Sequence, residues 1–156
     1  LIKFLSKKQM KNILVLLLLT VVGNTSFGQD VPFDKKLFKE QKAESKIAED
    51  HLNDGEDFLM SFPADYRKAA AEFLQANEFN QNSADLNYKI GICYYYFDKY
   101  KMQEFFVKAY NLKPTVSPDI HYYMGVSLHI NGEWQKAINE YNTFIRNDKK
   151  YKNCCN

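Results

Sequence analysis

The side chains best suited to catalysis or metal binding are three histidines and three cysteines, and they are scattered along the chain. His121 and His129 are eight residues apart on one expected helix, too far to share a metal ion, and His51 is remote from both in sequence. The sequence contains no glycine-rich phosphate loop, nucleophile elbow or metal-binding motif. We therefore predict a protein that is not an enzyme and has no metal or other cofactor.

The cysteines support the same prediction. Cys93 lies in an apolar stretch, and we expect it to be a small residue of the core. Cys154 and Cys155 are neighbours in a polar tail, where they could bridge each other only with strain and are too few to form a metal site. An exported disulfide framework would have an even and spaced set of cysteines. The redox state of the tail pair stays open.

The N-terminal segment has the pattern of a secretory signal peptide. A short basic region at Met10 is followed by ten apolar residues, 13–22, and then by a polar segment. Ser26 and Gly28 stand at positions −3 and −1 of a cleavage site before Gln29. The alternative, an uncleaved anchor, is disfavoured because the apolar run is too short to span about 30 Å of hydrocarbon. We expect an exported, periplasmic protein, with association to the outer membrane as a further possibility.

Removal of this segment changes the sign of the net charge. The chain of 156 residues has 21 basic and 19 acidic side chains, a net charge of +2. Residues 1–28 hold four lysines and no acidic residue, so residues 29–156 have 17 basic and 19 acidic side chains. A net charge of −2 gives no indication of a nucleic-acid partner. The apparent basicity belongs to the signal segment.

A period of 34 residues runs through the rest of the chain. Aromatic residues recur at Tyr66, Tyr100 and Trp134, and glycines recur at Gly91 and Gly125. Repeats of this length predict stacked helical hairpins. Two more sets keep the spacing, namely Phe73, Val107 and Tyr141, and Ala76, Tyr110 and Phe144.

Local signals divide each repeat into two helices. Ser83 and Ser117 are expected caps, Pro118 suits a first helical position, and Asn131-Gly132 suits a turn. We expect a long charged helix over 34–59, broken near residues 53–55, at the start of the chain. The other expected helices cover 65–79, 84–97, 99–112, 121–130 and the segment that begins at Trp134 and has an apolar stripe up to Ile145.

These residues resemble the tetratricopeptide repeat, a helical hairpin with small and aromatic residues at fixed positions. In the middle repeat the match departs at Gln103, and the apolar stripe falls one residue early, through Phe105 and Phe106. The resemblance implies an all-α, right-handed superhelix of about three helix pairs. The last repeat matches at Gly125, Gly132, Trp134, Ala137 and Tyr141, and the middle repeat at Gly91, Tyr94 and Tyr100.

A closer resemblance covers roughly residues 29–150. The segments "SADLNYKIGICY" and "KPTVSPDIHYYMGVSLHINGEWQKAINEYNTFI" are similar to the N-terminal repeats of exported OmpA-type envelope proteins. In that family a β-propeller, a small β-sandwich and a peptidoglycan-binding domain follow the repeats, and some members serve type IX secretion and gliding motility. Together with the signal pattern and the repeat spacing, we expect a signal peptide with an upstream extension (1–28), an N-terminal helical region (29–64), the repeats (65–150) and a tail (151–156).

The function implied is a non-catalytic scaffold that binds a protein or peptide partner in the cell envelope. The last expected helix would leave an apolar edge at Ile138, Phe144 and Ile145 with no further sequence to cover it. We therefore expect a truncated repeat module of an OmpA-type protein. The alternatives are a small stand-alone periplasmic enzyme or metal-binding protein on a helical scaffold, and a gene fragment without function.

The resemblance also implies that the first helix of each repeat lines a partner-binding groove. Tyrosine and aliphatic residues stand where members that clamp acidic peptide ends need lysine and asparagine, so we expect an apolar helix or extended segment as the ligand. The alternative is that much of the run from Tyr94 to Tyr96 packs between helices. The predicted groove residues are Tyr88, Ile92, Tyr95, Tyr96, Asp119, Tyr122, Val126, His129 and Ile130.

Overall fold

The computed structural model describes residues 28–34 and 36–147, and the regular structure in these residues is all helical. The all-α prediction is therefore confirmed, while the apolar run 13–22 and the tail with its two cysteines lie outside the described residues. A 3-10 turn, η1 (Lys39–Gln41), precedes the α-helices. These are α2 (Lys42–Met60), α3 (Tyr66–Phe79), α4 (Ala84–Phe97), α5 (Met102–Leu112), α6 (Ile120–Ile130) and α7 (Trp134–Asn147).

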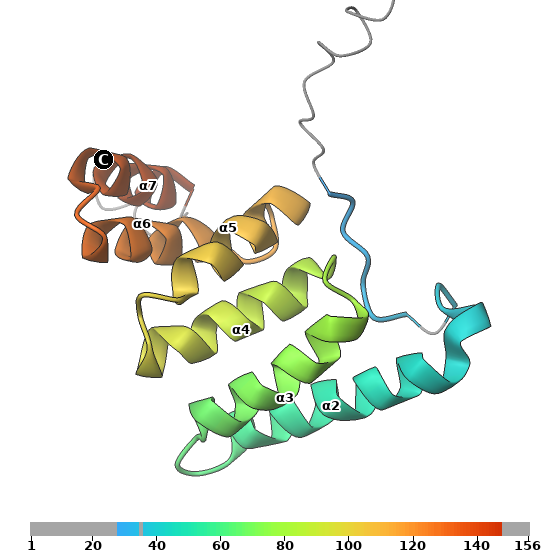
Figure 1. The fold of residues 1–156 in the computed structure, drawn as a ribbon. Helices are drawn as coiled ribbons and strands as arrows, with labels where there is room; N and C mark the ends of the chain where they lie inside the picture. Colours follow the sequence, from blue (N-terminus) through green and yellow to red (C-terminus); the bar gives the residue numbers. More distant parts are fainter. Residues whose placement is uncertain (1–27, 35, 148–156) are drawn as a thin grey trace, which may run out of the picture.

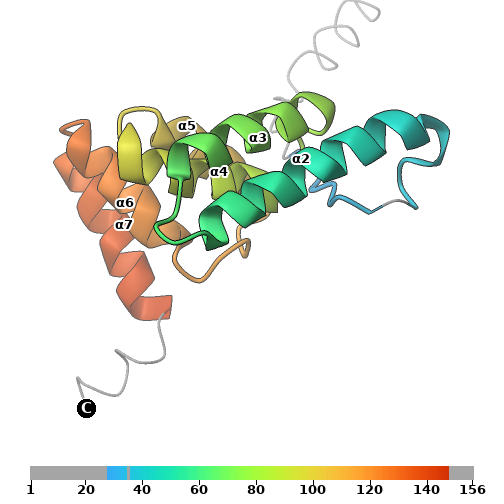
Figure 2. The same ribbon diagram turned by 90° about the horizontal axis from the view of Figure 1, so that it is seen from below.

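Each helix packs against its neighbours in the sequence. α2 lies on α3, α4 on α5 and α6 on α7, while contacts of α3 with α4 and of α5 with α6 join these pairs. Figures 1 and 2 show the turns α2–α3, α4–α5 and α6–α7 on one side of the stack. None of the helices described is both long enough and apolar enough to cross a membrane.

Within each pair, a glycine of the first helix lies directly against an aromatic ring of the second. A Cβ atom added at the glycine would come within 2.5, 2.7 and 2.6 Å of the ring in the three pairs. Because such a separation overlaps the ring, only glycine allows the two helices this close an approach. The three contacts are Gly55 with Phe73, Gly91 with Phe106, and Gly125 with Tyr141.

The first of these contacts overturns the predicted break in the first helix. α2 is continuous from Lys42 to Met60, and Gly55 is buried within it against Phe73. Glycine costs about 1 kcal/mol relative to alanine in a helix interior, which is why the sequence suggested a break. Contact with a ring that is fully buried stabilises the helix at this point instead. The predicted helical start near residue 34 is also wrong, because α2 begins only after η1.

The aromatic residues with the clearest repeat spacing do not form the core. Tyr100 is 75% exposed and Trp134 is 61% exposed, while Tyr66 is half-buried and stacks on Tyr96 with ring centroids 3.9 Å apart. These positions lie at or beside the turns, where a side chain can extend beyond the packed helices. Trp134 is therefore not a buried aromatic residue, and we expect Trp134→Ala to cost less than the roughly 3–5 kcal/mol lost with a buried ring.

The shift of one residue in the middle repeat is confirmed. Phe106 is fully buried, whereas Val107, which the 34-residue spacing matches with Tyr141, is exposed. Met102 and Ala109 on the same stripe are also fully buried. Helix α5 begins at Met102, later than predicted, because residues 99–101 form a turn. The pair α4–α5 therefore keeps the packing of the other pairs in a shifted register.

Side-chain caps are confirmed at one predicted helix start and corrected at another. The Ser83 hydroxyl accepts a hydrogen bond from the Leu86 amide at 3.3 Å and caps α4. Ser117 does not cap α6, which begins at Ile120 with Asp119 at the N-cap position and without a side-chain cap hydrogen bond. The Ser117 hydroxyl instead accepts from the Asp119 amide at 3.2 Å, before the helix starts, and Pro118 therefore also lies outside α6.

An N-terminal segment that precedes the helices is tied onto the turn between α3 and α4. The Val31 amide donates to the Asn82 carbonyl at 2.8 Å, and Asn80 Nδ2 donates to the Val31 carbonyl at 2.7 Å. Asp30 accepts a hydrogen bond from the Ala84 amide at 2.9 Å, at the start of α4. This docking has no local sequence signal, because its partners lie about fifty residues away.

The register of the α4–α5 pair can be tested with two adjacent residues. We expect Phe106→Ala to lower the free energy of unfolding by about 3–5 kcal/mol, because a fully buried ring is lost. Val107→Ala should change it by less than about 1 kcal/mol, since Val107 is exposed. Urea unfolding followed by circular dichroism measures both. Equal losses for the two variants would contradict the shifted register.

Candidate partner-binding face on α4 and α6

The predicted groove residues lie on α4 and α6, with Asp119 at the cap of α6. Most of the half-buried members also pack against the core, so they have a structural role whatever they bind. The exposed members are the ones that a partner could reach without rearrangement. Tyr88, Ile92, Tyr95, Val126 and Ile130 are half-buried, and Tyr96, Asp119, Tyr122 and His129 are exposed.

A cluster of tyrosines connects α4 with α6, and its centre is a residue that sequence reasoning missed. The ring centroid of Tyr123 lies 6.1 Å from that of Tyr88, 5.4 Å from Tyr95 and 5.2 Å from Tyr122. Tyr123 also stacks on Phe106 of α5 with centroids 5.0 Å apart. The signal that could have identified it is its position beside Tyr122, which places one ring at the surface and the next ring toward the core.

Hydrogen bonds between hydroxyl groups strengthen the same connection. Tyr95 of α4 and Tyr122 of α6 share a side-chain hydrogen bond. Tyr88 bonds to Ser117, which lies just before α6. The ring of Tyr123 thus contacts those of Tyr88, Tyr95 and Tyr122, and we call these four residues with Tyr96 the tyrosine face.

Burial favours the protonated form of the hydroxyl groups of Tyr88, Tyr122 and Tyr123 and raises their pKa. It raises the pKa of Tyr123 to about 12, and the neighbouring Tyr88, Tyr96 and Asp119 add to that shift. Burial also raises the pKa of Tyr88, although the hydrogen bond with Ser117 acts in the opposite direction. A neutral phenol both donates and accepts a hydrogen bond, so this face can pair with the backbone of a partner as well as with apolar side chains.

The predicted alternative, that the tyrosine run packs between helices, holds for one of its three members. Tyr94 is buried, and its ring stacks on Phe105 with centroids 5.4 Å apart. Tyr95 is half-buried within the tyrosine face, and Tyr96 is exposed and stacks on Tyr66 of α3. The three successive tyrosines therefore point to the core, to the cluster and to the surface.

A cluster of ion pairs lies at the α2 side of the tyrosine face. Lys89 Nζ lies 2.5 Å from Glu56 Oε1 of α2 and 2.7 Å from Asp85 Oδ2 of α4. Burial lowers the pKa of Lys89, but the hydrogen bonds and charges of the two carboxylates outweigh this and raise it overall. The lysine charge is therefore fully paired, and one lysine with two carboxylates leaves the cluster acidic.

Hollows occur at the ends of the predicted groove. One cavity of about 280 Å³ lies between the N-terminal segment and the helices, and Asp30, Leu52 and Asp85 are among its lining residues. Another of about 480 Å³ is lined by residues that include Asp119 at the start of α6 and Phe144 of α7. Among the residues that the structure describes, no three His, Cys, Asp or Glu side chains are placed to hold a metal ion.

Two of the three histidines join helices within a pair. His51 Nδ1 lies 2.7 Å from Glu72 Oε2, and His121 Nδ1 lies 2.7 Å from Glu140 Oε2. Each histidine precedes its pair's close-packed glycine by four residues, and each glutamate directly precedes the matching ring. The repetition of this contact indicates a role in packing the first helix on the second. His129 packs on Trp134, with ring centroids 4.9 Å apart.

No protein-family model matches the chain, and no curated protein is similar to it.

The buried position of Tyr123 can be tested by titration. Its pKa of about 12 in the folded chain lies above the ordinary value of 10.0, to which it should return on unfolding. The contribution of Tyr123 to stability is therefore complete below pH 10 and is lost as the pH rises toward 12. We expect the absorbance of tyrosinate to show a late component that Tyr123→Phe removes. A titration that Tyr123→Phe leaves unchanged above pH 11 would contradict the assignment.

Proposed function

We propose that the chain is a tetratricopeptide-type scaffold of the cell envelope that binds a protein or peptide partner on the tyrosine face. Three features support the repeat assignment: consecutive helix pairs, a glycine–ring contact in each pair, and a His–Glu contact at the same place in the first and third pairs. Stacked pairs of this kind build a right-handed superhelix with a concave surface in the repeat class. The resemblance to the repeats of OmpA-type envelope proteins supports the cellular setting.

The observation that carries the proposed binding function is the connection of α4 and α6 by tyrosines whose rings and hydroxyl groups reach the surface. Tyrosine offers a large contact area, loses little side-chain entropy and keeps a polar group, which explains its enrichment in binding sites. Tyr96 and Tyr122 are the exposed members of the cluster. The half-buried members hold them in place through ring contacts and the Tyr95–Tyr122 hydrogen bond.

The chemistry of the face favours a partner with both apolar side chains and accessible backbone. The tyrosines are neutral at physiological pH, and the adjacent Lys89 is engaged by two carboxylates, so a partner chosen mainly by charge is disfavoured. An amphipathic helix or an extended segment supplies apolar contacts together with hydrogen-bonding groups. We propose such a segment from an envelope protein as the ligand.

Site-specific photocrosslinking in the producing cell tests this function. A photoreactive phenyl ketone side chain replaces Tyr122 in one variant and Ile47, an exposed residue of α2, in the control. We expect one discrete adduct from position 122, with a yield that falls several-fold when Tyr96→Ala is added, and no adduct from position 47. Tyr88 is unsuitable because its ring packs on Phe106 and its replacement would disturb the fold. Equal labelling at positions 47 and 122 would contradict the assignment.

We further propose that the chain is exported and cleaved before Gln29. The support is the pattern of residues 10–28 and the exposure of Gln29 at the start of the described region. N-terminal sequencing of the protein recovered from the periplasm should begin at Gln29. Ser26→Phe, which places a bulky residue at position −3, should block cleavage. Recovery of an intact N-terminus from the cytoplasm would contradict export.

A further inference from the structure

The turns within the three helix pairs carry large apolar side chains that no helix covers. Phe62 is fully exposed, Met60 is 85% exposed, and Tyr100 and Trp134 are also exposed. Single exposed apolar residues are ordinary, but here each of the three turns carries at least one. Figures 1 and 2 show that the three turns share one side of the stack, and we call Met60, Phe62, Tyr100 and Trp134 the turn edge.

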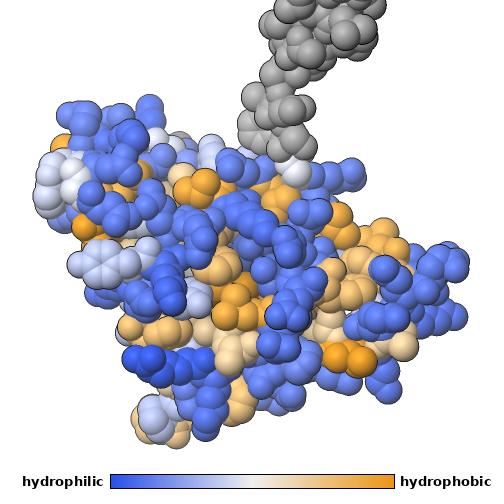
Figure 3. All heavy atoms as spheres, in the orientation of Figure 1, coloured by the Kyte–Doolittle hydropathy of each residue, from blue (hydrophilic) through white to orange (hydrophobic). Residues whose placement is uncertain are grey.

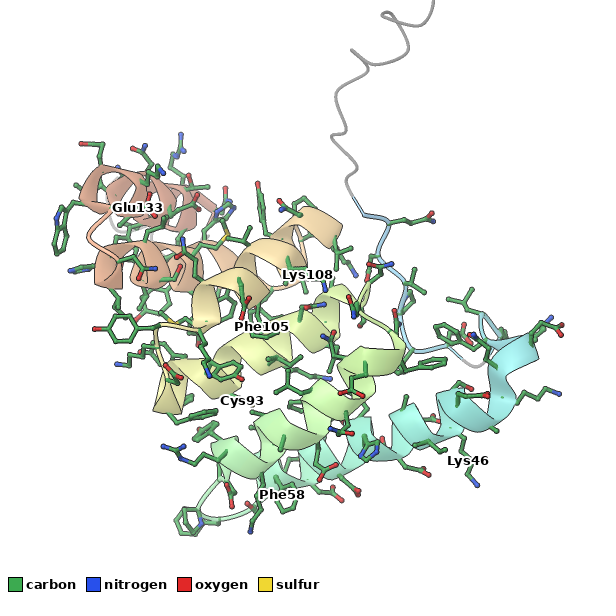
Figure 4. All side chains as sticks on the ribbon, in the orientation of Figure 1. Lys46, Phe58, Cys93, Phe105, Lys108 and Glu133 are labelled. Atoms are coloured by element: carbon green, nitrogen blue, oxygen red, sulfur yellow. The ribbon has the colours of Figure 1, made fainter. Side chains whose placement is uncertain are left out.

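Contacts between the turns hold this edge as one row. The stacked rings of Tyr66 and Tyr96 link the first turn to the second. A hydrogen bond from Asn131 Nδ2 to Gln103 Oε1 links the second pair to the third. In Figure 4 the labelled Phe58 and Glu133 mark the first and last turns of the row. Figure 3 shows pale, weakly polar side chains protruding along this side of the molecule.

Basic side chains accompany the apolar ones at each turn. Arg67 lies over the Phe97 ring at 4.8 Å, and Lys99 lies over the Tyr95 ring at 5.1 Å. Lys101 lies 3.6 Å from Asp98, a separation that leaves it partly available. The turns thus combine five basic residues with three acidic ones in a chain whose residues 29–156 are acidic overall. The basic residues are Arg67, Lys68, Lys99, Lys101 and Lys136, and the acidic residues are Asp65, Asp98 and Glu133.

We propose that the turn edge is a peripheral contact site for an anionic lipid surface. Tryptophan and tyrosine favour the boundary between water and hydrocarbon, where the ring is in an apolar layer and the polar atom stays hydrated. Phenylalanine and methionine side chains at the tips of turns can enter the acyl layer without moving the helices. Lysine and arginine beside them are attracted to anionic headgroups. Exposed phenylalanine and methionine occur at the first turn, tyrosine at the second and tryptophan at the third, each with basic residues beside them.

The shape of the edge favours a lipid surface over a protein partner. The strongest contacts of protein interfaces lie in packed central pockets from which water is excluded. The turn-edge side chains instead protrude singly from three convex turns and are separated by charged residues. A bilayer accepts such side chains one by one, because its surface is fluid and its headgroups can pair with the intervening lysines.

Trp134 is the only tryptophan of the chain, so its fluorescence reports on this edge alone. The full chain is mixed with vesicles of phosphatidylcholine, or of equal parts phosphatidylcholine and phosphatidylglycerol. Only the anionic vesicles should shift the emission to shorter wavelength, and high salt should reverse the shift because it screens the lysines. Emission is a sharper measure than sedimentation, because residues 13–22 could bind lipid on their own without placing Trp134 in it.

Matched variants separate the turn edge from other exposed apolar residues. Phe62→Ser combined with Tyr100→Ser removes two anchoring side chains. We expect this variant to need an anionic lipid concentration about tenfold higher to reach half of the emission shift. Lys99→Gln combined with Lys101→Gln should raise that lipid concentration roughly tenfold. Each lysine near an anionic surface contributes about a fivefold factor in affinity, and the contribution of Lys101 is smaller because Asp98 partly neutralises it. Leu37→Ser with Ile47→Ser, which changes two residues that are also exposed but lie away from the turns, should leave that lipid concentration unchanged.

Three results would overturn the lipid contact. The first is the absence of a shift with anionic vesicles. The second is a shift that is equal for both vesicle types or survives the Phe62 and Tyr100 changes. The third is a shift produced by a vesicle-free extract of envelope proteins and not by vesicles, which would make the edge a protein interface. The crosslinking experiment at Tyr122 is independent of all three, because Tyr122 lies on the tyrosine face.

Discussion

The close approach of a glycine to an aromatic ring within each helix pair is the contact on which the rest of the structure depends. A Cβ atom at Gly55, Gly91 or Gly125 would overlap the ring on the partner helix, so these glycines set the separation of the two helices. Burial of Phe73 and Phe106 then provides much of the core of a chain with few large aliphatic residues inside. The His–Glu contacts beside two of the rings fix the rotation of one helix against the other.

This constraint also decides which surfaces are left for partners. Because the second helix of each pair lies between successive first helices, the surfaces of α4 and α6 are brought into reach of each other only by long side chains. Tyrosines meet that requirement at Tyr95 and Tyr122, and Tyr123 fills the space behind them on Phe106. The half-buried tyrosines of this face therefore also pack the helices together. They hold the exposed tyrosines in position for binding.

The turn edge also follows from the pairing of the helices. The turn within each pair lies at the end of the packed interface, so its residues can have side chains that do not contribute to packing. Aromatic residues with 34-residue spacing at Tyr100 and Trp134 therefore have a cause other than the core. The two proposed surfaces are defined by different residues, one set across the first helices and one at the turns, and they adjoin where Lys99 of the second turn lies over the Tyr95 ring.

Local patterns in the sequence determined the helical class and most helix limits, because these depend on caps and periodicity within a few residues. The sequence also predicted that Cys93 and Tyr94 are buried, since both lie on the apolar side of α4. Tertiary structure alone decided that α2 continues through Gly55, because contact with the Phe73 ring, eighteen residues away, compensates for the low helix propensity of glycine. It likewise decided that Trp134 faces solvent and that Tyr123 is the centre of the tyrosine face. Spacing along a chain specifies which residues are equivalent, but contacts between distant helices determine which of them are buried.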